Sequence, residues 1–415
     1  MTELSPEFAK EARKTARGEV PFQAADLFYT RTDPRGVIES ASMVFQRLGG
    51  FEWDEILGAP HKLVRHADMP RGLFHLLWGR LKSGKQTGYY VKNMDADGRH
   101  YWVFGVVSPI EGGFLSTYFK PLSPLREKVE TIYAKAHAAE TDGLSPEDSA
   151  AQIAADLAEL GYPTYDVFHS AALSEEWDAK KTYCGDALDP LQKRFVALSA
   201  SIAQVQAETM EMTDAFKAIR TVPLNMRIIA SRLENAGGPI SAISVNYSQM
   251  LEEMSTWVKT FVDGEESVFA LIRNAILRVQ FLGFASALYG EMQAALKKEE
   301  FSEEVGVDAE AEVVALQSLT EEFMQETRKA LTRVETEAGR LGRSVLDMKR
   351  YVTGLSSTRM MCKIESASLS NSGTALTGIV DQLDACQDEI EERLARIVDQ
   401  NAVIQSHTAM LRTLI

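Results

Sequence analysis

The chain has 415 residues, of which 25% are charged and 45% hydrophobic, an ordinary composition for a soluble protein with room for two or three domains. Its formal net charge of −15 argues against a general binder of nucleic acid or of anionic membranes, because both require clustered Lys and Arg. No apolar run approaches the ~20 residues that cross a bilayer, and the N-terminus lacks the basic and apolar blocks of a signal peptide. Cys184, Cys362 and Cys386 form neither a disulfide framework nor a metal-ligand spacing. We therefore expect a cytoplasmic protein without a membrane span.

Residues 21–123 predict an antiparallel five-stranded sheet with a helical cap, preceded by a short amphipathic helix within residues 1–20. A strand, a Pro-Gly turn and a second strand are expected within Leu27–Ile38. Helices are expected at 54–57 and 70–82. Three further strands, separated by turn signals, are expected at Tyr89–Asn93, His100–Val107 and Gly113–Phe119. This order of elements describes an α+β fold of the PAS sensor type.

A series of residues from Asp33 to Pro109 carries a closer resemblance. Its members are Asp33-x-x-Gly36-x-Ile38, Phe45, Gly49, Glu55-x-Leu57-Gly58-x-Pro60-His61, Val64-Arg65-His66-x-Asp68-Met69-Pro70, Phe74-x-x-Leu77-Trp78-x-x-Leu81-x-x-Gly84, Val91-Lys92-Asn93, Gly98, Tyr101-Trp102 and Pro109. In this order they resemble the PAS domain of aerotaxis receptors. In that family the pocket holds FAD non-covalently and the redox state of FAD is sensed. The resemblance therefore implies FAD as cofactor, although Gln86-Thr87 stands where the family has Pro-Trp.

Five residues of this series are the candidate FAD contacts: Arg65, His66, Asp68, Trp78 and Asn93. A flavin requires an apolar slot for its rings and donors to its carbonyl groups, and Arg65 offers a donor fork with a fixed charge. His66 changes its charge near neutral pH, and Asp68 would anchor Arg65 or an adenosine hydroxyl. Each has a plainer reading: Asp68 as the cap of the following helix, His66 as a surface or capping residue, and Trp78 as core.

A haem- or metabolite-binding PAS sensor is the alternative, with His61 or His75 as the candidate iron ligand. The light-reactive cysteine of flavin photoreceptors is absent, because no cysteine precedes Cys184.

Residues 124–190 predict a helical connector that carries strain away from the sheet. Helices are expected at 125–137, from Ser145-Pro to Leu160, and at 165–177. The start of the second helix is marked by the Ser145 hydroxyl as cap and by a proline at the first helical position. His169 and Trp177 are interpreted as packing residues.

Only Pro223 and Pro239 follow Pro190, in a region rich in Ala, Glu, Leu and Met, so residues 191–298 predict a long helical hairpin. Gly237 and Gly238 suit the end of a helix and Pro239 the first turn of the next one, which predicts a tip at 235–239. The apolar stripe expected before the tip is Leu224, Ile228, Ile229 and Leu233, and after it Ile240, Ile243, Tyr247, Met250 and Leu251.

The run Leu224-Asn225-x-x-Ile228-x-Ala230-x-Arg232, followed by Gly237, Ile240 and Ile243, resembles the signalling hairpin of methyl-accepting chemotaxis receptors. The resemblance implies that the chemotaxis histidine kinase and its coupling protein contact Leu224, Asn225, Ile228 and Arg232. The tip has diverged, since Leu233, Glu234, Asn235 and Pro239 replace family residues. A non-sensing PAS/coiled-coil interaction protein therefore stays an alternative.

Residues 299–312 form an acidic stretch that predicts a solvated linker, and residues 313–415 predict a second hairpin. A shift of 136 residues superposes Ile228 on Ile364, Leu233 on Leu369, Gly237 on Gly373 and Ile243 on Ile379. If the second hairpin repeats the first, the two would close a four-helix bundle within one chain, where receptors normally form it as a homodimer. An unrelated coiled coil is the alternative.

No enzyme is expected, because the chain has no phosphate-binding glycine loop and no nucleophile–base constellation. The acids at 299–312 are interpreted as linker and not as a metal site, and no convincing set of methylation sites is found.

Overall fold

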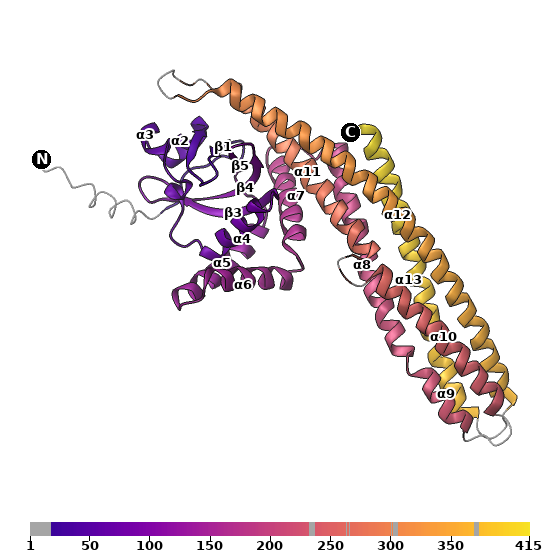
Figure 1. Cartoon of the computed structure of the whole chain (residues 1–415). Coiled ribbons are helices and arrows are strands. Elements are labelled where there is room, and N and C mark those ends of the chain that lie inside the picture. The colour runs from indigo at the N-terminus through magenta and orange to yellow at the C-terminus, as the bar shows by residue number, and fades with distance from the viewer. Residues whose placement is uncertain are drawn as a thin grey trace, which may run out of the picture. The chain divides into compact units, whose positions relative to one another are not determined.

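A computed structural model describes residues 18–231, 237–262, 264, 266–299, 301, 306–368 and 373–415. The chain divides into two compact units, drawn in Figure 1. One unit joins Met1–Lys193 with Leu277–Thr327, and the other joins Arg194–Ile276 with Arg328–Ile415. The grouping differs from the expected division, because residues 277–327 belong to the unit that contains the sheet.

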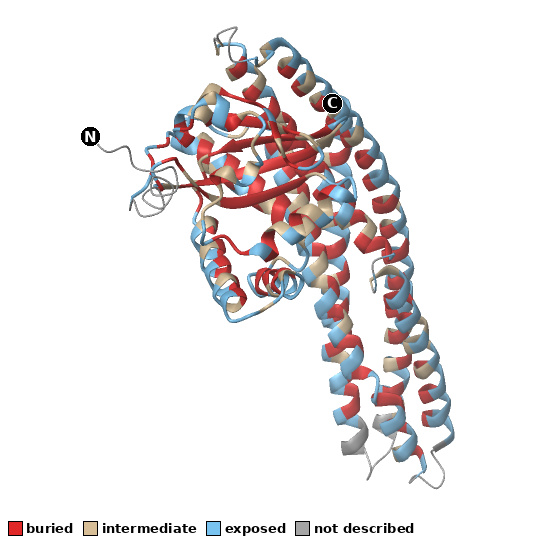
Figure 2. Ribbon diagram, turned by 60° about the vertical axis from the view of Figure 1, so that its left-hand side comes forward, coloured by how far each residue is buried: buried red, intermediate tan, exposed pale blue. Residues whose placement is uncertain are grey.

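The first unit is built on the five strands β1 (Leu27–Thr32), β2 (Ile38–Ala41), β3 (Thr87–Met94), β4 (His100–Ile110) and β5 (Gly113–Phe119). They lie in the order β2-β1-β5-β4-β3, and every neighbouring pair is antiparallel. Nearly all strand residues are buried, as Figure 2 shows. The five strands and the α+β class expected from the sequence are confirmed.

The helical cap consists of α2 (Met43–Gly49), α3 (Trp53–Ile56), the short 3-10 helix η1 (His61–Val64) and α4 (Arg71–Lys82). The sequence analysis anticipated α3 and α4 but missed α2 and η1. Helix α2 begins where the Ser42 hydroxyl accepts from the Phe45 N–H, and it ends at Gly50, whose φ of 63° suits a residue without a side chain.

Three helices follow the sheet as expected: α5 (Leu125–Thr141), α6 (Pro146–Glu159) and α7 (Tyr165–Tyr183). The Ser145 hydroxyl accepts from the Asp148 N–H at 3.1 Å, which confirms the predicted cap of α6. Helix α7 packs on the sheet, where the rings of Trp177 and Phe119 meet at 5.9 Å. His169 and Trp177 are buried, as expected for packing residues. The segment expected to be a connector thus covers one face of the sheet.

The C-terminal part of α11 (Val268–Leu296) also packs in this unit. The Tyr289 and Ser108 hydroxyls lie 2.8 Å apart, and the Phe281 ring lies 4.2 Å from that of His169. Within the described part of the chain, one helix, α11, is long and apolar enough to cross a membrane. The sequence analysis had expected no apolar run of that length. Because 72% of its most apolar stretch is buried, α11 has the character of a core helix.

The acidic stretch 299–312 is not simply a solvated linker. Glu299 accepts from the Met43 N–H at 2.9 Å, and Glu312, which is only 3% exposed, pairs with Arg31 at 2.8 Å. Residues 300 and 302–305 lie outside the described part. Two of the acids therefore bind the first strand, β1, and the start of α2.

The second unit contains long helices that run side by side (Figure 1). Their bounds are α8 (Pro190–Ile219), α9 (Val222–Ser231), α10 (Gly237–Phe261), α12 (Ala309–Ser368) and α13 (Gly373–Leu414). The prediction of a single continuous helix up to the tip is wrong, because the helix is interrupted between α8 and α9. Pro223 has no N–H to bond to the Ile219 carbonyl, so the α8 ladder stops there.

The shift of 136 residues superposes the four pairs of identical residues given above. It also superposes many buried positions of the two hairpins. The buried pairs are Phe195/Leu331, Leu198/Val334, Ile202/Ala338, Val205/Leu341, Met212/Met348, Phe216/Val352, Ile219/Leu355, Met226/Cys362, Ile243/Ile379, Tyr247/Leu383, Met254/Ile390 and Val258/Leu394. Both hairpins thus present the same stripe at the same distance from their tips, which supports a repeat.

The two hairpins pack against each other within one chain. Arg396 of α13 pairs with Glu208 of α8 at 2.8 Å, and the Trp257 indole N–H of α10 donates to the Ser344 carbonyl of α12 at 3.2 Å. Buried residues face the common axis of the helices (Figure 2). The unit is a four-helix bundle closed by a single chain, the arrangement expected if the second hairpin repeats the first.

Several expectations fall on residues outside the described part: the N-terminal helix up to residue 17, residues 235–236 of the tip expected at 235–239, and the candidate contact Arg232. Residues 237–239 of that tip are the first turn of α10.

Candidate functional site

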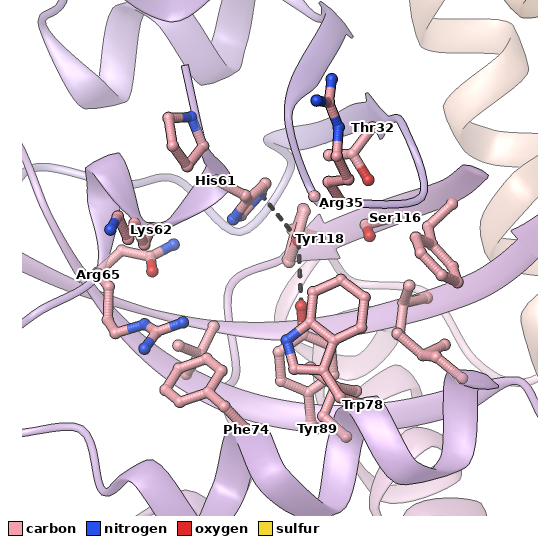
Figure 3. A pocket seen from close by; sticks show the side chains of 18 residues that line it. Thr32, Arg35, His61, Lys62, Arg65, Phe74, Trp78, Tyr89, Ser116 and Tyr118 are labelled. Carbon is pink, nitrogen blue, oxygen red and sulfur yellow. Dashed lines mark hydrogen bonds between the residues drawn. The ribbon is translucent and has the colours of Figure 1, made fainter. Parts of the chain in front are cut away.

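The first unit encloses a cavity of about 250 Å³ between η1, α4 and the sheet, shown in Figure 3. Its wall combines aromatic and aliphatic side chains with several polar groups: Thr32, Arg35, Gly36, Pro60, His61, Lys62, Arg65, Phe74, Leu77, Trp78, Leu81, Tyr89, Val91, Asn93, Val107, Phe114, Ser116 and Tyr118. An apolar slot with few polar groups is the usual form of a small-molecule site.

Trp78 of α4 forms one wall, edge-on to Phe114 with ring centres 5.4 Å apart. Gly36 permits this position, because a Cβ there would lie 3.3 Å from the indole and its φ of 80° suits glycine. The aromatic wall does not depend on residues 86–87, where the family's tryptophan is missing.

The alternation of β3 decides which of its residues reach the cavity. Tyr89, Val91 and Asn93 line it, whereas Tyr90 points to the opposite face of the sheet and bonds to Glu176. The sequence analysis named Asn93 but overlooked Tyr89, although the period of two along β3 could have revealed it.

Arg65 is the most unusual residue of the wall. A backbone bridge pairs it with Asn93, and its guanidinium lies over the Phe74 ring at 3.5 Å. Its Nε is buried without a hydrogen-bond partner, as is the Nδ2 of Asn93, and no carboxylate among the described residues pairs with it. Burial lowers the pKa of Arg65. A buried N–H donor without an acceptor is costly, so the cavity is shaped for a ligand that accepts hydrogen bonds.

His66 and Asp68, two of the five candidate contacts, do not line the cavity. The His66 N–H donates to the Lys92 carbonyl at 3.2 Å, and Asp68 binds the Lys92 ammonium at 2.7 Å. Arg65 and His66 are neighbours on an extended segment, so when one faces the cavity the other faces away.

Asp68 does not cap α4 either. The first N–H groups of that helix, those of Arg71 and Gly72, donate instead to the Glu140 carboxylate of α5 at 2.8 and 2.7 Å. The carboxylate that satisfies the helix start therefore comes from a distant part of the chain, which no local pattern reveals.

His61 joins a chain of hydroxyls along the wall. Its Nε2 lies 3.1 Å from the Thr30 hydroxyl and 3.2 Å from that of Tyr118, which in turn lies 3.1 Å from the Tyr89 hydroxyl (Figure 3). Burial and the nearby Arg65 lower the pKa of His61 to about 4, so the ring is neutral at pH 7. His75 is exposed on α4 and does not line the cavity.

No protein-family model matches the chain. Over 115 residues of its PAS-type region it is 34% identical to the aerotaxis receptor of Escherichia coli (strain K12). The match covers 26% of this chain and 23% of that receptor. The sheet unit is thus similar to the matched part of that receptor, and its fold is of the PAS type. Among solved structures, an RNA-binding Light-Oxygen-Voltage receptor shares 17% identity over 35% of this chain and 39% of that chain, but its TM-score of 0.21 is too low to assign a common fold.

The mouth of the PAS cavity carries two cations that the sequence analysis did not single out. Arg35 is 83% exposed, Lys62 is exposed, and both side chains extend away from the aromatic wall (Figure 3). The cavity thus combines an aromatic slot, inner donors and two outer cations, of which Arg35 is paired with the Asp33 carboxylate at 2.8 Å. At about 250 Å³ it lies just below the usual 300–1,000 Å³ of small-molecule sites, enough for a ring system whose polar tail leaves at the mouth.

The candidate partner residues lie on α9, in the other unit. Leu224 and Ile228 are 59% and 44% exposed, and Asn225 is exposed as well. The stripe that packs inside the bundle is Val222, Met226 and Ala230. The expectation that Leu224 and Ile228 belong to the core stripe of the hairpin is therefore wrong, and their exposure leaves them accessible to a partner.

Proposed function

We propose that this chain is a cytoplasmic sensory receptor in which FAD, held in the PAS cavity, reports redox or energy state, and the helical bundle carries the output. The observation that supports this most is the Nε of Arg65, which is buried without a hydrogen-bond partner in the wall of an aromatic slot. The chain matches less than a quarter of the aerotaxis receptor's length, so the likeness supports the PAS part only.

The residues present fit a flavin. Trp78 and Tyr89 would flank the ring system, Arg65 and Asn93 would donate to its carbonyl groups, and the cations at the mouth would face the pyrophosphate. When bound, FAD would supply an electron-accepting couple. The protein's contribution is to hold Arg65 in a dry site, where a change of ligand charge alters its energy far more than in water.

An absorption spectrum of the purified protein tests this function. We expect flavin bands in air that bleach with dithionite, and loss of these bands in an Arg65→Ala variant. Arg99→Ala, which removes a cation outside the cavity, is the matched control. Protein that is colourless and takes up no added FAD would refute the proposal.

A haem in the same cavity is less well supported. His61 is its one histidine among the described lining residues, and its Nε2 is engaged with Thr30 and Tyr118. A Soret band in the same spectrum would favour haem.

Transmission would run through α11, which begins in the bundle unit and ends on the PAS sheet. Ser108 of β4 bonds to Tyr289, and β3 contacts α11 where Gly88 approaches Phe281. A shift of these strands on ligand reduction would move α11 directly, a shorter route than the one expected through residues 124–190.

The output surface would include Leu224, Asn225 and Ile228 of α9, and these residues together with Arg232 would contact a chemotaxis histidine kinase and its coupling protein. Exposed apolar side chains on a bundle favour such docking. Co-purification of the kinase should drop in a Leu224→Ala/Ile228→Ala variant and persist in Val403→Ala, an exposed position of α13. Equal binding by all three proteins would exclude α9 as the output surface.

A further inference from the structure

A groove of about 570 Å³ opens along the first hairpin where α8 breaks into α9 and both face α10. Its floor is apolar, formed by Phe216, Pro223 and Val258, with Leu224 and Leu251 higher on the walls. Pro223 both causes the break and lines the groove, so the opening is built into the sequence.

The rim of the groove is basic. Lys217, Arg220, Arg227 and Lys259 stand around it, with Glu252 as the acid among the lining residues. This is unexpected in a chain with 44 Lys and Arg against 59 Asp and Glu. Lys217 pairs with Asp214 in solvent, whereas the other three cations have no ion pair among the described residues.

The second hairpin shows the same position with its charges neutralised. There Arg359 and Lys363 of α12 pair with Asp384 of α13 at 3.0 and 2.6 Å. Lys363 is the equivalent of Arg227, and Asp384 that of Ser248, under the shift of 136 residues.

The difference extends along the return helix. Asp384, Glu391 and Glu392 of α13 correspond to Ser248, Ser255 and Thr256 of α10. The first hairpin therefore lacks the carboxylate, that of Asp384, which pairs with both Arg359 and Lys363, and it keeps an acid, Glu252, where the second hairpin has Asp388.

We propose that this groove binds an acidic amphipathic helix of a partner protein, whose apolar stripe lies on Phe216, Leu224 and Val258 and whose carboxylates pair with Arg220, Arg227 and Lys259. The partner supplies from outside the acids that α13 supplies within the chain. The proposal deepens the output role of this hairpin by naming the chemistry of what docks there.

A pair of synthetic helical peptides tests the charge preference. One has leucine at every third or fourth position with glutamate on both flanks, and the other has lysine in place of glutamate. Fluorescence anisotropy with the full chain should show binding of the acidic peptide, weakening as salt rises, and at least roughly tenfold weaker binding of the basic one.

Two double variants test the position. Arg220→Glu/Arg227→Glu reverses the rim, and Ser248→Asp/Thr256→Glu gives the groove the acids of the second hairpin while keeping its cations. Both double variants should bind the acidic peptide roughly tenfold more weakly, or weaker still. Lys329→Glu/Arg333→Glu, the same charge change at exposed positions of α12, should not.

Equal binding of the two peptides, or equal loss in the control variant, would overturn the proposal. So would self-association in sedimentation that the rim reversal abolishes, because a second copy would then fill the groove with the acidic face of α13. Circular dichroism confirms that each variant keeps its helices. Kinase co-purification that survives the loss of peptide binding would reject the acidic-helix groove without rejecting the output role.

Discussion

The two faces of the PAS sheet each bury a charged side chain, and they treat it in opposite ways. On the face covered by α7, Glu176 is fully buried and accepts from the Tyr90 and Ser123 hydroxyls and from the N–H groups of Leu122 and Ser123, at 2.6–2.8 Å. On the cavity face, Arg65 has a buried Nε with no partner. A buried polar group whose hydrogen bonds are all made within the protein holds elements together. A buried polar group without a partner within the protein indicates a place where a ligand binds.

The largest expected effect is on the satisfied side. Glu176→Ala leaves two buried N–H groups and two hydroxyls without their acceptor and should lower the free energy of unfolding by about 3 kcal/mol or more, measured by urea denaturation. Glu176→Gln should be far milder, since its oxygen can face the N–H groups and its NH₂ the hydroxyls. Glu175→Ala, the exposed neighbour, is the control. An alanine effect no larger than that control would show that this network is not a structural clamp.

The opposite sign is expected on the cavity side. Arg65→Met removes a half-buried cation whose buried Nε has no acceptor, so the flavin-free protein should be unchanged or more stable by up to about 2 kcal/mol. Added FAD should raise the melting temperature of the parent chain but not of the variant. If Arg65→Met destabilises the flavin-free protein as strongly as Glu176→Ala, the guanidinium is part of the scaffold and the contrast between the two faces fails.

A smaller effect is expected where α11 meets the sheet. Tyr289→Phe deletes one buried hydrogen bond to Ser108 and should cost about 1 kcal/mol, with Tyr183→Phe, 73% exposed, as the silent control. If α11 carries the signal, this variant should keep its flavin spectrum while the protease sensitivity of the bundle no longer differs between oxidised and dithionite-reduced protein. A redox difference that persists unchanged would place transmission elsewhere.

Most of this fold could be predicted from the sequence because most strands are runs of aromatic and β-branched residues bounded by turn residues. The sequence also placed Arg65, Trp78 and Asn93 correctly on the cavity wall. His66 and Asp68 were misplaced because a linear motif does not show which way successive residues of an extended segment point. The β-bridge between Arg65 and Asn93 settles that direction, and it joins residues far apart in the chain.

The bundle was harder to predict because helices rich in apolar residues offer more than one stripe. Leu224 and Ile228 satisfy helical spacing as well as Val222 and Met226 do, and only packing against the other helices decides between them. The role of residues 277–296 could not be predicted either, since Ser108 and Tyr289 meet only through the tertiary fold.

The smallest effect concerns two histidines, one on each face. His61 at the cavity and His169 against α11 both have a pKa lowered to about 4, chiefly by burial. Between about pH 6.5 and 4 the unfolded chain binds protons at both rings and the folded chain does not, so stability should fall as pH drops, by up to about 1.4 kcal/mol per pH unit for each. Arg65 also lowers the pKa of His61, whereas the cations near His169 are Arg80 and Arg278. Arg65→Met should therefore raise the pKa of His61 alone in an NMR titration, and equal shifts at both rings would show that Arg65 does not distinguish the two faces.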